Sequence, residues 1–244
     1  MLRTTRSVFL AAFAVICCVG AFAQGVGTSI WEKPGGETMP AASWLGSTGV
    51  VFIPSALVGR AMSAQGYFHW INDVDVNSGE TDMYIWGADV MLTSNLEIGA
   101  VRYDFRDADW DETVINAKYN LDLGRWTGNP SAPEVAVGVR DLTDELNRAL
   151  YVVVTKAIQL RETEGVSQFT LSAGFGSTEE DNGTLDGFFV GVELVPSPGF
   201  RLQGEYDGDA FNACLRFFPT RNLSLDVATI DGSLGLGATY RTGF

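Results

Sequence analysis

Closely spaced carboxylates are the first feature of this sequence that could bind a ligand. Asp107, Asp109, Asp111 and Glu112 fall in one short acidic stretch. Carboxylate oxygens are the hard ligands that Ca²⁺ takes in proteins. The stretch lacks the glycine and the downstream glutamate of an EF-hand loop, so a solvated acidic loop is the simpler interpretation. We therefore predict no cofactor, with Ca²⁺ at the acidic loops as the one candidate metal.

A second set of charged residues alternates with apolar residues in extended segments. Charges of both signs in a confined interior can pair and close it, or they can line a hydrated path. The sequence leaves both possibilities open, but it predicts an arginine–carboxylate ladder within residues 187–244. The residues predicted to line the interior are Asp89, Lys118, Arg140, Glu193, Arg201, Glu205, Arg216, Asp226 and Arg241.

His69 is the single histidine of the chain and stands between Phe68 and Trp70. A hydrolase would need a nucleophile and a base within hydrogen-bonding distance. Nothing in the sequence pairs His69 with a particular serine or aspartate. We therefore predict that the protein is not an enzyme and that His69 is an interior or aromatic-belt residue.

The elements that position these residues are β-strands. From residue 167 onward, segments of about ten residues alternate apolar and polar side chains, with turn residues between them. Successive side chains leave a strand on opposite faces, and strands with an apolar face and a charged face are typical of transmembrane barrels. One segment places these apolar residues on one face: Phe211, Ala213, Leu215 and Phe217.

Six further strands between residues 64 and 158 bring the total to about twelve, an even number like that of single-chain bacterial barrels. The sequence thus predicts an all-β, transmembrane, antiparallel up-and-down barrel. Most of the aspartate and glutamate residues lie in every second connection between strands, such as residues 73–82, 104–112 and 141–148. We predict that these connections are the outer loops. Tyr240 and Phe244 continue the apolar face of the last strand, and we predict that they form an assembly signal.

The amino-terminal region has the features of a cleaved signal peptide. Arg3 and Arg6 precede an apolar run that ends in an A-x-A site at residues 21–23. The predicted organisation is a signal peptide (1–23), an irregular segment (24–63) and the barrel (64–244), located in the bacterial outer membrane. Cys17 and Cys18 lack the small preceding residue of a lipoprotein signal, and the remaining Cys214 cannot form an internal disulfide.

A short motif at residues 46–56, Gly-Ser-Thr-Gly-Val-Val-Phe-Ile-Pro-Ser-Ala, resembles the opening of YjbH-like outer-membrane proteins. This family is linked to exopolysaccharide production and contributes no catalytic residues. Further similar segments follow in the same order, and the resemblance extends from Gly46 to the end of the chain. The segments are PEVAVGVRD (133–141), VTK (154–156), FVGVE (189–193), EYDG (205–208) and NACLR (212–216).

Two hypotheses about function follow from these observations. The resemblance implies a barrel of exopolysaccharide production or secretion, whose polar lumen guides or conducts glycan, with other export proteins as partners. The alternative is a structural or adhesive surface barrel whose acidic loops bind a partner or divalent cations. Both require membrane lipid and the barrel assembly machinery, and the formal net charge of −14 argues against nucleic-acid binding.

Overall fold

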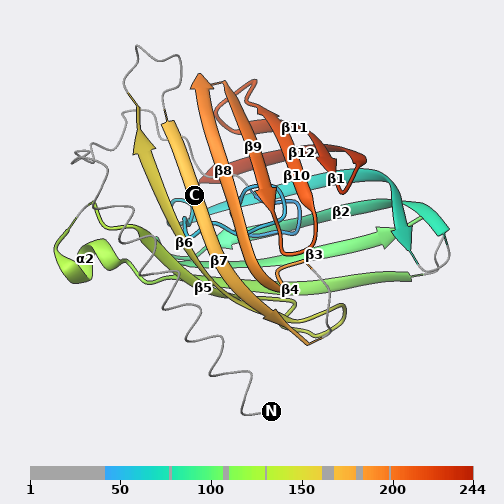
Figure 1. Cartoon of the computed structure of the whole chain (residues 1–244), viewed down its shortest axis with the longest axis horizontal. Coiled ribbons are helices and arrows are strands. Elements are labelled where there is room, and N and C mark those ends of the chain that lie inside the picture. The colour runs from blue at the N-terminus through green and yellow to red at the C-terminus, as the bar shows by residue number, and fades with distance from the viewer. Residues whose placement is uncertain are drawn as a thin grey trace.

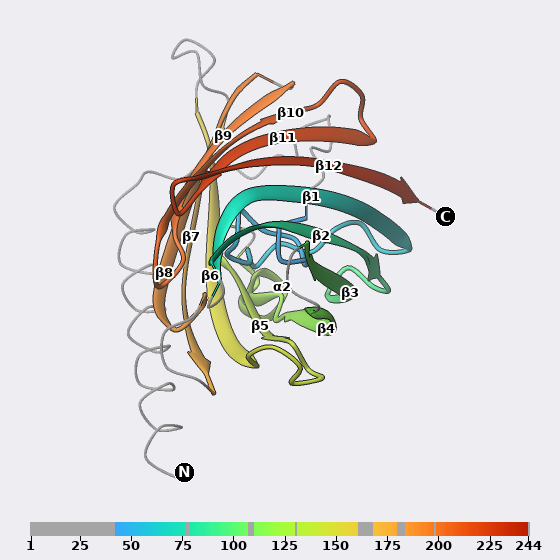
Figure 2. The ribbon, with the colours of Figure 1, turned by 90° about the vertical axis from the view of Figure 1, so that its right-hand side faces the viewer.

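Each strand of this protein pairs with the strands before and after it in the chain, and the last strand pairs with the first. The computed structural model describes residues 42–76, 79–106, 110–129, 131–160, 168–179, 184–197 and 199–243 (Figures 1 and 2). The predicted all-β, antiparallel, closed barrel of about 12 strands is confirmed. The predicted signal peptide lies outside the described residues. The strands are β1 (Ser63–Val76), β2 (Gly79–Met91), β3 (Leu96–Phe105), β4 (Trp110–Asn120), β5 (Glu134–Arg140), β6 (Ala149–Gln159), β7 (Gln168–Thr178), β8 (Gly187–Ser197), β9 (Phe200–Tyr206), β10 (Phe211–Phe217), β11 (Leu223–Ile230) and β12 (Ser233–Gly243).

The outward face of the barrel is apolar and the inward face is polar. Along β10 every second side chain is exposed, beginning with Phe211, and the residues between them are buried. Large apolar side chains stand exposed on neighbouring strands too, including Leu202, Val227 and Leu236. The faces therefore follow the period-two pattern of the sequence, with polarity inverted relative to a protein that packs an apolar core away from water.

The hairpin of β1 and β2 is longer than the sequence suggested. We expected a loop over residues 73–82, but β1 runs to Val76 and β2 begins at Gly79. Asp73 has a φ of 48°, and the pairing register shifts between Ile71 and Val74. A bulge of this kind takes up an extra residue and lets pairing resume beyond it. The acidic residues of this hairpin that are described therefore lie on strand ends.

A short helix, α2 (Leu123–Thr127), lies in the connection between β4 and β5 and contacts β5. The carboxylate of Asp122 accepts a hydrogen bond from the N–H of Arg125 at its start, and Gly128 ends it with a φ of 66°. Trp126 on this helix is exposed. Among the described residues, no helix combines the length and the apolar character needed to cross a bilayer.

Asp141 organises the connection between β5 and β6. Its carboxylate accepts hydrogen bonds from the N–H groups of Glu145, Leu146 and Asn147 and from the hydroxyl of Thr143, at 2.7–3.1 Å. Desolvation raises the pKa of Asp141, but the hydrogen bonds outweigh it, and the pKa lies below its usual value. The ionised carboxylate therefore stabilises this loop.

We expect Asp141→Asn to lower the free energy of unfolding by about 1 kcal/mol or more near pH 7, because bonds to a charged acceptor become bonds to a neutral one. Since the folded pKa is depressed, this contribution is present above the unfolded pKa of about 3.9 and is lost as the pH falls through the folded pKa. Urea titrations of refolded protein should thus show a difference from wild type that shrinks as the pH falls below 4, roughly. Asp144→Asn, an exposed position in the same loop, is the control. A difference that does not change with pH would contradict the assignment.

Residues 42–56 lie inside the barrel. Figures 1 and 2 show this segment, in blue, surrounded by the strands. The sequence predicted an irregular segment over residues 24–63, with its first part in the periplasm or inside the barrel mouth. Trp44, Val51 and Ile53 are fully buried in the lumen, where they belong to a cluster of buried apolar side chains.

Candidate functional site in the barrel lumen

We call residues 42–56 the plug, because they fill the middle of the lumen and fold back on themselves. Isolated antiparallel bridges join Ala42 to Thr48 and Gly49 to Pro54. The N–H of Trp44 donates to the carbonyl of Val51 at 2.6 Å. These contacts make a compact double turn, two chain segments thick.

Glu205 on β9 binds the main chain of the plug. Its carboxylate accepts hydrogen bonds from three consecutive N–H groups, those of Val51, Phe52 and Ile53, at 2.8, 2.5 and 3.3 Å. Asn212 on β10 donates a fourth bond to the same carboxylate at 3.2 Å. Successive N–H groups of this kind form a site for an anion. Glu205 was predicted as one carboxylate of an arginine ladder, but its described partners are these N–H groups.

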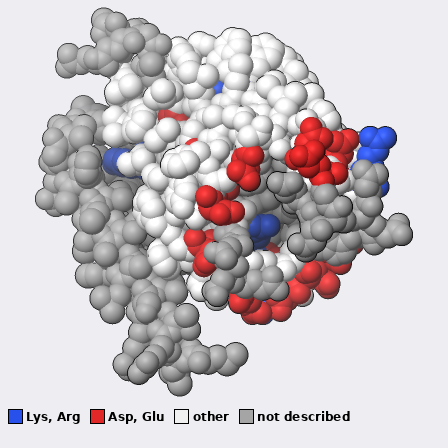
Figure 3. All heavy atoms as spheres, turned by 45° about the vertical axis from the view of Figure 1, so that its right-hand side comes forward, with Lys and Arg blue, Asp and Glu red and all other residues white. Residues whose placement is uncertain are grey.

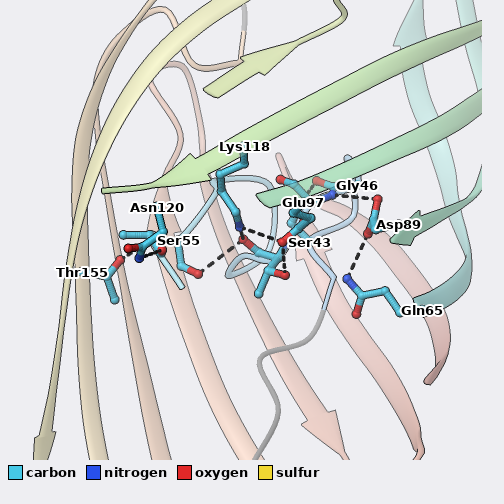
Figure 4. Close-up of polar contacts among 12 residues, drawn as sticks. Ser43, Gly46, Ser55, Gln65, Asp89, Glu97, Lys118, Asn120 and Thr155 are labelled. Atoms are coloured by element: carbon cyan, nitrogen blue, oxygen red, sulfur yellow. Dashed lines mark hydrogen bonds and ion pairs between the residues drawn. The ribbon is translucent and has the colours of Figure 1, made fainter. Parts of the chain in front are cut away.

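Glu97 and Lys118, on β3 and β4, form a second junction with Thr48 on the wall opposite β9. Figure 4 shows Glu97 beside Lys118. The N–H and hydroxyl of Thr48 donate to the Glu97 carboxylate at 2.5 and 2.6 Å. The Lys118 ammonium donates to the Thr48 carbonyl at 2.8 Å and pairs with Glu97 at 3.2 Å. The threonine of the motif is thus held at its main chain and its side chain by a fully buried ion pair.

Amide and hydroxyl side chains of the wall bind both ends of the plug. Asn116 donates to the carbonyl of Leu45 at 2.9 Å, and Asn120 donates to the carbonyl of Ala56 at 2.8 Å. The N–H of Ala56 donates to the Thr155 hydroxyl at 2.8 Å. Nearly all of these bonds go to main-chain groups of the plug.

Asp89 lies beside the same wall. It accepts from the Gln65 amide at 2.9 Å and, more weakly, from the N–H of Ser47 at 3.4 Å (Figure 4). The Tyr67 hydroxyl also lies within 3.4 Å of this carboxylate.

Glycines in the plug and in the wall allow close packing. A Cβ at Gly46, where φ is 76°, would collide with Val101, and a Cβ at Gly49 would collide with the carbonyl of Ile53. Gly235 of β12 leaves room for the ring of Trp44, which stacks on His69 at 4.5 Å between centroids. The glycines of the motif are therefore explained by a left-handed turn and by contact distance.

Two arginine–carboxylate pairs lie within the stretch where the sequence predicted a ladder. Arg201 pairs with Glu193 at 3.1 Å, and Arg216 binds both oxygens of Asp226 at 2.8 and 3.0 Å. Arg216 also donates to the carbonyl of Ala42 at 3.0 Å, which joins this ladder to the plug. Arg241 is buried on β12, with its guanidinium over the ring of Phe218.

All nine predicted lumen residues point inward, and eight of them are buried. The ninth, Arg140, is half-buried at the end of β5 and lines a cavity of about 10 Å³ with Tyr151 and Phe52. This volume is about that of one water molecule. His69 is fully buried, and its two ring nitrogens form no hydrogen bond with the described residues. With the plug in place, the middle of the lumen is filled.

Of the four predicted Ca²⁺ ligands, the structure describes Asp111 and Glu112. Asp107 and Asp109 lie outside the described residues. Asp111 and Glu112 belong to β4 rather than to a loop, and they point to opposite faces of the strand. Asp111 pairs with Arg102 on the outer face. No group of three metal-ligating side chains is present in the part of the chain that the structure describes.

Acidic residues are nevertheless concentrated at one end of the barrel. Figure 3 shows carboxylates around one opening, at the ends of the hairpins that the sequence predicted to be outside. The exposed members include Glu80, Asp104, Asp144, Glu179 and Asp231.

Of the two residues predicted to form an assembly signal, Tyr240 is exposed on the outer face of β12, and Phe244 lies outside the described residues.

Sequence reasoning missed the plug as a site. A signal was present, because the motif at residues 46–56 is rich in glycine and small residues and has no strand period. Its partners are distant in the chain, however, and Glu205 is 154 residues from Val51. Nothing local to the motif indicates which carboxylate binds it.

The site and the fold define a closed β-barrel with an internal plug. No family model matches the chain, and no curated protein matches it. Two solved structures show a low similarity. Pseudomonas putida OprB, in its low-pH structure, is 13% identical over 75% of this chain and 92% of that chain, with a TM-score of 0.29. Ail, the attachment invasion locus protein of Yersinia pestis, is 10% identical over 74% of this chain and 96% of that chain, with a TM-score of 0.20.

Proposed function

We propose that this protein is a bacterial outer-membrane β-barrel of exopolysaccharide production, closed at rest by its own plug. The membrane location is supported by the outward face, since exposed Phe, Leu and Val on a closed barrel suit lipid. Every strand edge is paired, which is the condition for a sheet to sit in a bilayer.

One observation supports the glycan role most directly. The separate segments that resemble YjbH-like proteins meet in space as the plug and its binding groups. Residues 46–56 make up most of the plug, and Thr155, Glu205 and Gly191, each from another of those segments, lie against this motif. Arg216, from a further segment, bonds to Ala42 at the start of the plug. The resemblance therefore falls on one assembled site rather than on scattered positions.

We propose no catalytic step for this barrel. Its partners would be outer-membrane lipid, the barrel assembly machinery and other export proteins. A second candidate function is a structural or adhesive surface barrel, which the filled lumen and the acidic end in Figure 3 would suit. The two candidates differ in whether the plug has to move.

A deletion strain of the source bacterium separates them. We expect exopolysaccharide at the cell surface to fall when the gene is removed and to return with the wild-type gene. A variant whose plug is locked to the wall by a disulfide between Ala56→Cys and Thr155→Cys should restore the protein in the membrane but not the polysaccharide. Full restoration by the locked variant would favour the structural role, and normal export without the gene would end the glycan proposal.

A further inference from the structure

Several polar atoms of the lumen wall have no hydrogen-bond partner while the plug is in place. Within the described part of the chain these include Gln65 Oε1, both ring nitrogens of His69, Ser224 Oγ and Thr239 Oγ1. All four residues are at least 98% buried. Thr239 pairs in register with Ser224 on one side and with Tyr67 on the other, so the atoms form one strip over β11, β12 and β1.

If the plug covered this wall permanently, apolar residues would suit the wall better than these polar ones. A buried polar atom without a partner destabilises the folded state, and an apolar residue of the same shape would not. Thr239 could be valine and Ser224 alanine without loss of packing. Their hydroxyls therefore indicate that the wall has a second occupant, one that supplies hydrogen bonds when the plug is absent.

On the basis of the proposed function, we infer that the wall behind the plug is a binding track for a neutral, polyhydroxylated sugar chain. The groups that now bind the plug recognise main-chain N–H and C=O groups, and hydroxyls can make the same bonds. When the plug leaves, the side chains that bind it would form hydrogen bonds with sugar hydroxyls in place of plug N–H and C=O groups. These side chains are Glu97, Asn116, Asn120 and Thr155.

The space and the aromatic lining suit a single sugar chain. The plug is two chain segments thick, so its departure leaves room for one extended oligosaccharide. Tyr67, Tyr103 and Tyr151 point into the lumen from β1, β3 and β6 and would offer ring faces and hydroxyls.

The charges of the wall favour a neutral chain over an acidic one. Among its described contacts Glu205 has N–H groups and the Asn212 amide but no cation. Glu97 pairs with Lys118, and the hydrogen-bond partners described for Asp89 are the Gln65 amide, the Tyr67 hydroxyl and the N–H of Ser47. With the plug out, these carboxylates would accept bonds from hydroxyls and repel the carboxylates of uronic acids.

The test needs a full-length protein whose plug is loosened while the wall is intact. Gly49→Val does this, because a Cβ there would collide with the carbonyl oxygen of Ile53 and lie 2.9 Å from the Cβ of Ser43, both inside the plug. Gly199→Val, where a Cβ meets nothing within 4 Å, is the matched control. Both are refolded, checked for heat-modifiable mobility and studied in planar bilayers with maltoheptaose, an oligogalacturonate of equal length, or polyethylene glycol of equal size.

We expect Gly49→Val to conduct and its current to be blocked by maltoheptaose at lower concentration than by the other two probes. Adding Ser224→Ala and Thr239→Val should weaken the maltoheptaose block by about fivefold or more, because two hydroxyl partners are lost. Thr229→Val, the same change on the outward face of β11, should leave the block unchanged. If Gly49→Val does not fold, Glu205→Gln is used in the same measurement.

Three results would overturn the inference: a folded, loosened barrel that does not conduct, equal block by polyethylene glycol, or a block insensitive to Ser224 and Thr239. The proposed function fails separately. A strain that exports polysaccharide normally without the gene, alongside a sugar block that depends on Ser224 and Thr239, would reject the cellular role and keep the binding track.

Discussion

Replacing Glu205 by alanine is expected to turn a closed barrel into a conducting one. The change leaves the N–H groups of Val51, Phe52 and Ile53 without their acceptor inside the lumen. Each unsatisfied N–H costs about 1–3 kcal/mol. Even a total of about 3 kcal/mol would shift the balance between seated and displaced plug by about a hundredfold.

Planar-bilayer recordings of the refolded protein measure this effect. Wild type should show rare openings, and Glu205→Ala should show frequent ones. Glu193→Ala removes a buried, inward carboxylate from the neighbouring strand, but the described partners of Glu193 are Arg201 and Gln203 rather than the plug. If Glu193→Ala opens the barrel as often as Glu205→Ala, the binding of the plug by Glu205 is not what closes the lumen.

The second large effect concerns the outward face. Val227 lies near the middle of β11 with 48% of its surface exposed, where a membrane location would put it against lipid tails. We expect Val227→Arg to destabilise the folded barrel by about 2–4 kcal/mol, as a cation at the bilayer midplane does. Urea titrations of folding into lipid vesicles give this number directly.

Leu223 on the same strand and the same face supplies the control. It begins β11 and pairs with Tyr240, at the edge of the apolar band. Leu223→Arg should cost about 0–1 kcal/mol, because the penalty falls toward the interface. Equal tolerance of both arginines would show that this face does not meet lipid.

The faces of the strands could be predicted from the sequence, and the contents of the lumen could not. Alternation is a local property, so Arg201, Gln203 and Glu205 could be placed inside from their neighbours alone. Which inward group binds which partner depends on the positions of strands far apart in the chain. Arg216 binds Asp226 within the predicted ladder, whereas Glu205 binds three main-chain N–H groups of the plug.

The degree to which side chains fill the lumen could not be predicted from the sequence either. Ser172 reads as a polar residue on a roomy inner face, but it is 1% exposed and bonds to the Thr155 hydroxyl at 2.8 Å. Aromatic side chains fill part of this space, because glycines on the paired strand have no side chain and leave room for their rings. Tyr151, for example, lies over Gly138. Such pairs depend on register, which no short stretch of sequence records.

The position of the plug also fixes an order of events during biogenesis. The plug precedes β1 in the chain, yet its partners Glu205 and Arg216 lie on β9 and β10, near the end of synthesis. Its other partners, Glu97 and Lys118, lie on β3 and β4. The contacts of the plug with β9 and β10 therefore form only once these late strands are in place. We expect the seam between β1 and β12 to seal around the plug, so that loosening it slows closure as well as opening the finished barrel.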